Sequence, residues 1–310
     1  MKEKNDYVDI QTEISMPRVP NRKVKSLFWF GIFLGFIILL VTSLIMFKFG
    51  KRSQYPLSNI ISSGDTIIKR IKAPSNFDWI IEEKNSFGEF IQNISLEPNK
   101  SKILDYKGNP ISNQAEHVAI MKLDVGSKDL QQCADAVIRI RAEYLFSLAR
   151  YDEIGFHFTS GDFFKWNDYR NGYRPIVSEN NSVTFKKTNL VDSSYKNFRK
   201  YLDVIYSYSG TISLYKETKK VNADGLIKTG DILITPGSPG HAVIIVGRAK
   251  SKINGEIIYL LAEGYTPAQS IHIITNPYNA KINPWYKLST SNEATITARY
   301  MFTKTDIRTF

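Results

Sequence analysis

Two apolar runs in the second half of the chain, residues 241–247 and 257–263, constrain its fold most strongly. The short segment between them contains Asn254-Gly255, a dipeptide typical of two-stranded hairpins. In the first run the residues at both alternating positions are apolar, which indicates burial on both faces. The pattern therefore predicts an antiparallel strand pair inside a core. Shorter strand-like runs occur at residues 118–125, 230–235 and 270–274.

Two amphipathic helices are expected before the hairpin. Asp129 is the predicted N-cap of the first, and Gln132 three residues later completes a capping box. Apolar residues then recur at helical spacing as far as Leu148. The second helix begins after Ser193 or Ser194. Helices followed by paired strands predict an α+β fold, in which an antiparallel sheet packs on the first helix.

An uncharged apolar run at residues 27–47 predicts one transmembrane helix. As a helix it would extend about 31 Å, enough to cross a hydrocarbon core of about 30 Å. The run is longer than the apolar part of a signal peptide. No alanine lies between Leu27 and Lys72, so an A-x-A cleavage site is missing. We therefore expect an uncleaved membrane anchor.

The anchor divides the chain into four expected parts. Residues 1–26 form a polar N-terminal tail, residues 27–47 the transmembrane helix, residues 48–76 a linker, and residues 77–310 a single α+β domain. Basic residues flank the anchor on both sides almost equally, so charge alone does not orient it. Because large domains are translocated largely regardless of charge, we expect a single-pass protein of the cytoplasmic membrane whose domain faces the periplasm or exterior.

The formal charge of +11 comes with scattered lysines and no zinc-finger, helix-turn-helix or RNA-binding signature. We therefore expect no nucleic-acid partner, and the charge fits either attraction to anionic envelope polymers or ordinary solubility. The four histidines lack metal-binding spacing, and one cysteine can form neither an intrachain disulfide nor a thiolate zinc site. No metal and no cofactor are expected, and the oligomeric state is not predicted.

Cys133 lies close to the start of the first predicted helix. The pKa of a thiol falls at a helix N-terminus or beside a cationic histidine, which favours nucleophilic chemistry. A small buried apolar residue is the alternative interpretation. His241 follows a turn and opens an apolar run, so it can point at a neighbouring helix end, although it can also be a structural core histidine. His117, His157 and His272 lack this context.

A third residue would orient the His241 imidazole. Glu263 ends the second run of the hairpin and would lie close to His241, on the face that carries Tyr259 and Leu261. A carboxylate among apolar residues requires a partner. Gln269 is the rival, because one residue of register error would exchange the two faces. The candidate catalytic residues are thus Cys133, His241 and Glu263, with Gln269 open as an alternative to Glu263.

Two family resemblances follow from these motifs. The segment Gly230-Asp231 and the run Gly240-His241-Ala242-Val243, with Cys133 upstream, resemble the NlpC/P60 and CHAP-type cell-wall peptidases, which have a papain-like fold. A second set of motifs comprises Gln132-Cys133-Ala134-Asp135, Arg141-Ala142-Glu143-Tyr144, Ser238-Pro239-Gly240-His241-Ala242-Val243 and Pro267-Ala268-Gln269. Through these motifs, the region from about 77 to 290 is more similar to a bacterial family, domain of unknown function 4846.

The peptidase resemblance implies a cysteine hydrolase with an NlpC/P60-like core. Cys133 would attack an amide carbonyl, His241 would act as base and then acid, and Glu263 would orient His241. The implied substrate is a cell-wall peptide or a related envelope molecule. An inactive envelope binding module and an acyltransferase or lipid amidase are the alternatives on the same fold.

Overall fold

The computed structural model describes residues 59–310 apart from 180–181, 292 and 304–305. The expected tail at 1–26, the expected anchor at 27–47 and the first part of the expected linker lie outside these residues. Among the helices that are described, none is long and apolar enough to cross a membrane.

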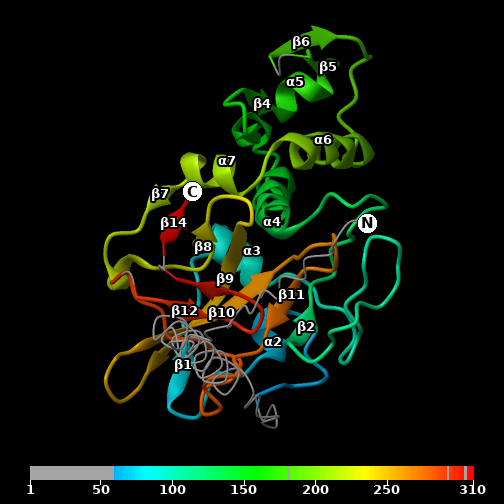
Figure 1. The fold of residues 1–310 in the computed structure, drawn as a ribbon. Coiled ribbons are helices and arrows are strands. Elements are labelled where there is room, and N and C mark those ends of the chain that lie inside the picture. The colour runs from blue at the N-terminus through cyan, green and yellow to red at the C-terminus, as the bar shows by residue number, and fades with distance from the viewer. Residues whose placement is uncertain (1–58, 180–181, 292, 304–305) are drawn as a thin grey trace, which may run out of the picture. The chain divides into compact units, whose positions relative to one another are not determined.

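The centre of the domain is a sheet in which every neighbouring pair of strands is antiparallel (Figure 1). Its strand order is β2-β11-β10-β9-β8-β14-β7, and β1 pairs with the far end of β9. These strands are β1 (Phe77–Trp79), β2 (His117–Ile120), β7 (Lys219–Lys220), β8 (Ile232–Thr235), β9 (His241–Ser251), β10 (Ile257–Glu263), β11 (His272–Ile274) and β14 (Ile307–Thr309). The fold is mixed α/β and dominated by antiparallel sheet, as the sequence predicts.

The β9–β10 hairpin is the longest pairing in the sheet, and it confirms the predicted turn. Gly255 has a φ of +74°, which glycine adopts without strain. The ladder contains a β-bulge: Leu260 pairs with Gly247 and Leu261 with Ile245, so Val246 has no partner on β10. Beyond the bulge, each β10 residue lies opposite a β9 residue one position earlier than a regular ladder would give.

Helices cover the sheet. Helix α4 contacts both β9 and β10, and its apolar side chains share one buried cluster with Ala242, Ile244 and Val246. The opposite face of β9, with Val243 and Ile245, packs in a second cluster with residues of the C-terminal segment. The helices are α2 (Ile67–Arg70), α3 (Phe87–Gln92), α4 (Cys133–Ser147), α5 (Trp166–Arg170), α6 (Tyr195–Tyr208) and α7 (Thr211–Glu217), with short 3₁₀ turns at Tyr151–Glu153 and Asp224–Leu226.

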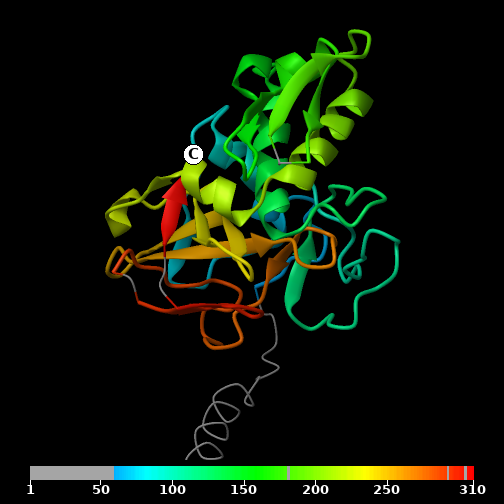
Figure 2. The same cartoon turned by 45° about the horizontal axis from the view of Figure 1, so that its top comes forward.

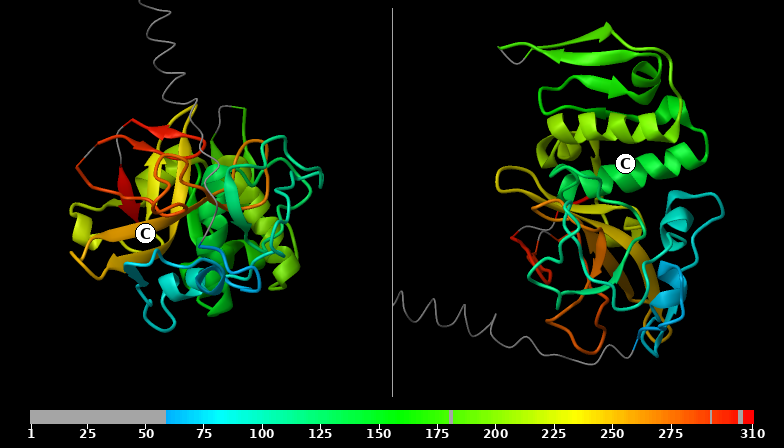
Figure 3. Two further views of the ribbon diagram at one scale, coloured as in Figure 1. Left: turned by 90° about the horizontal axis from the view of Figure 1, so that it is seen from below. Right: turned by 90° about the vertical axis from the view of Figure 1, so that its right-hand side faces the viewer.

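A lobe at residues 155–208 lies on the side of α4 away from the sheet (Figures 1, 2 and 3). It is held to α4 by aromatic packing, since the Phe146 ring stacks on that of Phe198 at 4.2 Å between centroids. Ser194 caps α6, as predicted, by accepting a hydrogen bond from the Asn197 N–H.

The sequence did not predict the hairpins of this lobe. They are β3 (Gly155–His157) with β4 (Phe163–Lys165), and β5 (Tyr173–Val177) with β6 (Val183–Lys187); a further pair, β12 (Thr295–Ile296) with β13 (Met301–Phe302), lies near the C-terminus.

The core includes residues that precede Phe77, the expected start of the domain. Ile67 and Ile71 are fully buried in the cluster that contains α4. The indole N–H of Trp79 donates to the Ile71 carbonyl at 2.8 Å, and that of Trp285 donates to the Lys72 carbonyl at 3.0 Å. The C-terminal part of the expected linker is therefore folded, because its isoleucines complete the core.

Candidate active site

Cys133 is the first residue of α4 and is partly exposed. The N-cap is Gln132, not Asp129 as predicted, and the Asp135 carboxylate accepts a hydrogen bond from the Gln132 backbone N–H at 3.1 Å. Asp129 does not cap the helix because its carboxylate accepts instead from the Ala268 N–H at 2.7 Å. The first N–H groups of a helix have no intrahelical acceptor, so the backbone N–H of Cys133 makes no hydrogen bond within α4. This N–H belongs to the same residue as the thiol and therefore lies close to it.

His241 is the first residue of β9, and only 3% of its surface is exposed. Its Nε2–H donates to Glu263 Oε2 at 2.8 Å, and the Cys133 thiol lies close enough to raise the pKa of the imidazole. Because Glu263 occupies Nε2, Nδ1 is the ring nitrogen available to the thiol. The three predicted residues therefore come together in the order thiol, imidazole, carboxylate.

Glu263 and Gln269 differ in their contact with the imidazole. Gln269 is buried, but its amide donates to the Pro267 carbonyl at 3.0 Å and accepts from Arg299 Nη1 at 3.3 Å. Glu263 is the residue that bonds to His241, and it lies on the same sheet face because the bulge at Val246 shifts the register.

A close approach of the end of β10 to the start of α4 brings the residues of the site together. Gly264 follows β10 directly and packs on the start of α4. A Cβ at this position would lie 2.9 Å from the Gln132 carbonyl oxygen and 3.0 Å from the Ala136 Cβ. Glycine therefore lets the end of β10 reach the helix residue that precedes Cys133.

Sequence reasoning missed the second layer of the site. His272 pairs with Glu263 across β10 and β11 and is fully buried. Its Nδ1 lies 2.8 Å from the Ser270 carbonyl oxygen, and its Nε2 lies 3.1 Å from Arg299 Nη1 and 3.6 Å from Glu263 Oε1. Arg299 Nε also lies 3.6 Å from Glu263 Oε1, which places a guanidinium charge behind the carboxylate. The sequence could have indicated His272, because it lies in the predicted strand that follows the one ending at Glu263. Nothing in the sequence indicated that Arg299 would lie near Glu263.

Burial and charge act in opposite directions on the buried pair. Burial alone would lower the pKa of His241, but its interactions with Cys133 and Glu263 raise it to about 9. Burial alone would raise the pKa of Glu263, but its hydrogen bond with His241 holds that pKa at about 2. At neutral pH the pair is therefore an imidazolium beside a carboxylate.

This pair predicts a stability that depends on pH. His241 has an ordinary pKa of 6.5 and a folded pKa of about 9, so its contribution is complete below pH 6.5 and is lost as the pH rises through 9. The loss should be on the order of 3 kcal/mol in the free energy of unfolding, measured by urea denaturation from about pH 6 to about pH 10. His241→Gln should flatten this fall, whereas the control His157→Gln, in the lobe, should retain it. A fall that survives His241→Gln would assign it to other groups.

A cleft leads to the thiol. It has a volume of about 380 Å³, and its walls come from the start of α4, the α6–α7 connection and the loop before β9. The lining includes Cys133, Tyr206, Gly210, Pro239 and Thr266. The nucleophile candidate is thus accessible, while His241 and Glu263 are enclosed.

The remaining histidines lie outside this group. The ring of His117 forms a hydrogen bond with the Ser101 carbonyl at 3.0 Å. His157, in the lobe, pairs with Glu217 at the end of α7 at 3.3 Å. Within the described ranges, no set of three or more His, Cys, Asp or Glu side chains is arranged to hold a metal ion.

The fold and the site thus define a class: a mixed α/β domain with an antiparallel sheet, in which a cysteine at a helix start lies beside a histidine at a strand start. The model of a family described as Domain of unknown function (4846) matches residues 67–309, and the chain belongs to this family. The resemblance drawn from the sequence motifs is confirmed in this respect. No curated protein and no solved structure matches the chain.

Proposed function

We propose that the protein is a cysteine hydrolase with a papain-like, NlpC/P60-like catalytic arrangement. The observation that carries the proposal is the arrangement of Cys133, which lines an open cleft, beside His241, which is hydrogen-bonded to Glu263. A nucleophile, a base within hydrogen-bond reach and a group that orients the base are the parts that thiol catalysis requires.

In the proposed reaction, Cys133 Sγ attacks the carbonyl carbon of an amide, and the thiol proton is held by His241. His241 then donates this proton to the leaving amine as the C–N bond breaks, which leaves a thioester on Cys133. Water attacks the thioester, His241 accepts a proton from it, and the carboxylic acid and free thiol are released. Glu263 holds the ring so that Nδ1 faces the thiol throughout.

Charge that develops on the substrate oxygen needs a donor. The Cys133 N–H has no intrahelical acceptor and lies at the positive end of the α4 dipole, so it supports an oxyanion site beside the nucleophile.

The substrate and location remain sequence-based parts of the proposal. We propose an amide in a cell-wall peptide or a related envelope molecule as substrate. The domain would be held at the outer side of the cytoplasmic membrane by residues 27–47.

Alkylation of Cys133 separates a hydrolase from an inactive binding module. Because the chain has one cysteine, one iodoacetamide adduct measured by mass spectrometry reports on this thiol alone. The hydrolase predicts a fast rate that persists below about pH 7, as expected when a cationic histidine stabilises the thiolate. A slow rate that rises only in alkaline solution, as for a free thiol, would contradict the proposal and favour the binding module.

A substrate panel then identifies the bond. Wall peptides and lipid amides are offered to the 310-residue chain, and products are followed by mass spectrometry. Release of amine from peptides alone supports the envelope peptidase. Release from lipid amides alone, or transfer to an added amine in place of water, would instead support the lipid amidase or acyltransferase.

A further inference from the structure

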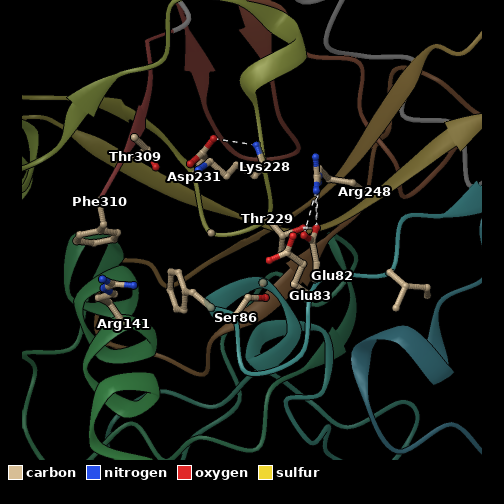
Figure 4. A pocket seen from close by; sticks show the side chains of 14 residues that line it. Glu82, Glu83, Ser86, Arg141, Lys228, Thr229, Asp231, Arg248, Thr309 and Phe310 are labelled. Carbon is tan, nitrogen blue, oxygen red and sulfur yellow. Dashed lines mark hydrogen bonds and ion pairs between the residues drawn. The ribbon is translucent and has the colours of Figure 1, made fainter. Parts of the chain in front are cut away.

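A second cavity, of about 540 Å³, lies apart from the thiol cleft and shares no lining residue with it (Figure 4). Its walls come from the segment before α3, from the middle of α4, from the turn before β8, from β9 and from the end of β14. Arg141 and Arg248 lie on opposite sides of it. The proposed hydrolysis uses neither residue.

The guanidinium group of Arg141 packs against aromatic rings, while its N–H groups have no hydrogen-bond acceptor among the described residues. The rings of Phe87, Tyr144 and Phe310 lie 4.9, 5.5 and 5.3 Å from its central carbon. In the described part of the chain it has no hydrogen bond and no ion pair, so its N–H donors lack a protein acceptor. Neighbouring arginines differ: Arg139 is bonded to Glu143, and Arg150 is paired with Glu153.

The other charges around the cavity are mostly neutralised. Arg248 forms a two-pronged pair with Glu82, with Nε–Oε1 and Nη2–Oε2 both at 3.0 Å. The Asp231 carboxylate accepts from the Lys228 backbone N–H at 2.8 Å. Among the described lining residues, the three basic side chains of Arg141, Lys228 and Arg248 equal in number the three acidic ones of Glu82, Glu83 and Asp231, so the charges of the lining balance.

We propose that this cavity binds a small organic carboxylate, whose two oxygens accept hydrogen bonds from the edge of Arg141. A guanidinium edge matches a carboxylate in a bidentate arrangement. Because the lining charges balance, a monoanion meets less repulsion from Glu82, Glu83 and Asp231 than a dianionic phosphate would. Ile81, Phe87 and Phe310 offer apolar surface to the rest of the ligand. This site is independent of the thiol chemistry, so either can fail without the other.

The test compares hippurate, which carries a carboxylate, with hippuramide, which has the same shape without the charge. Binding to the 310-residue chain in detergent is measured by saturation-transfer NMR on the aromatic protons of each probe. Hippurate should bind at least about tenfold more tightly than hippuramide, as expected for charge-assisted hydrogen bonds. Arg141→Gln should remove this difference. The matched control Arg150→Gln, beside the same Tyr144 ring but already ion-paired, should preserve it.

Three results would overturn the proposal. They are equal binding of the two probes, a hippurate preference that persists in Arg141→Gln, and displacement of hippurate by inorganic phosphate at a lower concentration than by unlabelled hippurate. The probe comparison uses the unaltered chain and so decides the question even if Arg141→Gln fails to fold. In that case Arg141→Lys, which keeps the charge but not the planar fork, should bind hippurate more weakly.

Discussion

Replacing Cys133 by alanine is expected to lower the turnover of the amide substrate by at least about 10⁴-fold, the scale on which removal of a catalytic nucleophile acts. The thiol forms the covalent bond in the proposed reaction, and the chain contains no second cysteine to replace it. Product release from wall peptides or lipid amides, followed by mass spectrometry, provides the rate. The thioester adduct should also disappear from the protein mass.

The fold should survive this substitution, because the side chain is small and lies at the partly exposed start of α4. Circular dichroism and the thermal midpoint check that point. Cys133→Ser, nearly isosteric with a weaker nucleophile, serves as the second variant and should also be strongly impaired. Equal turnover by the alanine variant and the unaltered chain would exclude Cys133 as the nucleophile.

Glu263→Gln should narrow the pH range of activity from its alkaline side. His241 must be protonated to give its proton to the leaving amine, so kcat/KM should fall above about pH 9, the pKa of this residue. Without the carboxylate, burial dominates and the pKa of His241 drops. The alkaline limb then moves to lower pH, and activity near pH 8 should decrease by at least about tenfold.

The matched control is Gln269→Ala. Gln269 is as buried as Glu263 and belongs to the same region, but it bonds to Arg299 and Pro267, not to His241. Its substitution should leave the alkaline limb in place. A Glu263→Gln profile that loses height without moving in pH would show that Glu263 does not set the charge of His241.

Local patterns predicted the parts of the site that depend on local structure. The Asn254-Gly255 turn placed the hairpin, but regular alternation from that turn would put Glu263 on the other face, and the unpredicted bulge at Val246 restores the face of His241. The α6 start at Ser194 was also readable, because a serine cap acts within three residues.

Long-range partners set the limits of this prediction. Asp129 has the side chain of an N-cap, yet its carboxylate is engaged by the Ala268 N–H, which is distant in sequence. Arg299 reaches Glu263 from a segment of short strands near the C-terminus, and Ile67 and Ile71 join the core from a segment of mixed composition. None of these contacts leaves a periodic signal in the chain.

The bulge at Val246 determines which face of the sheet the β9 side chains occupy relative to those of β10, and so whether His241 and Glu263 share a face. With the extra residue on β9, odd-numbered positions from His241 to Ile245 share a face with Tyr259, Leu261 and Glu263, whereas beyond it the even-numbered Arg248 does. If the register set near the turn continued along β9 without a bulge, Glu263 would pair with Ile244 and point to the side of the sheet that α4 covers. The sheet would keep its hydrogen bonds, and His241 would lose its partner. The bulge therefore compensates for the register at the turn, because one residue without a partner turns the rest of β9 over and returns His241 to the face of Glu263.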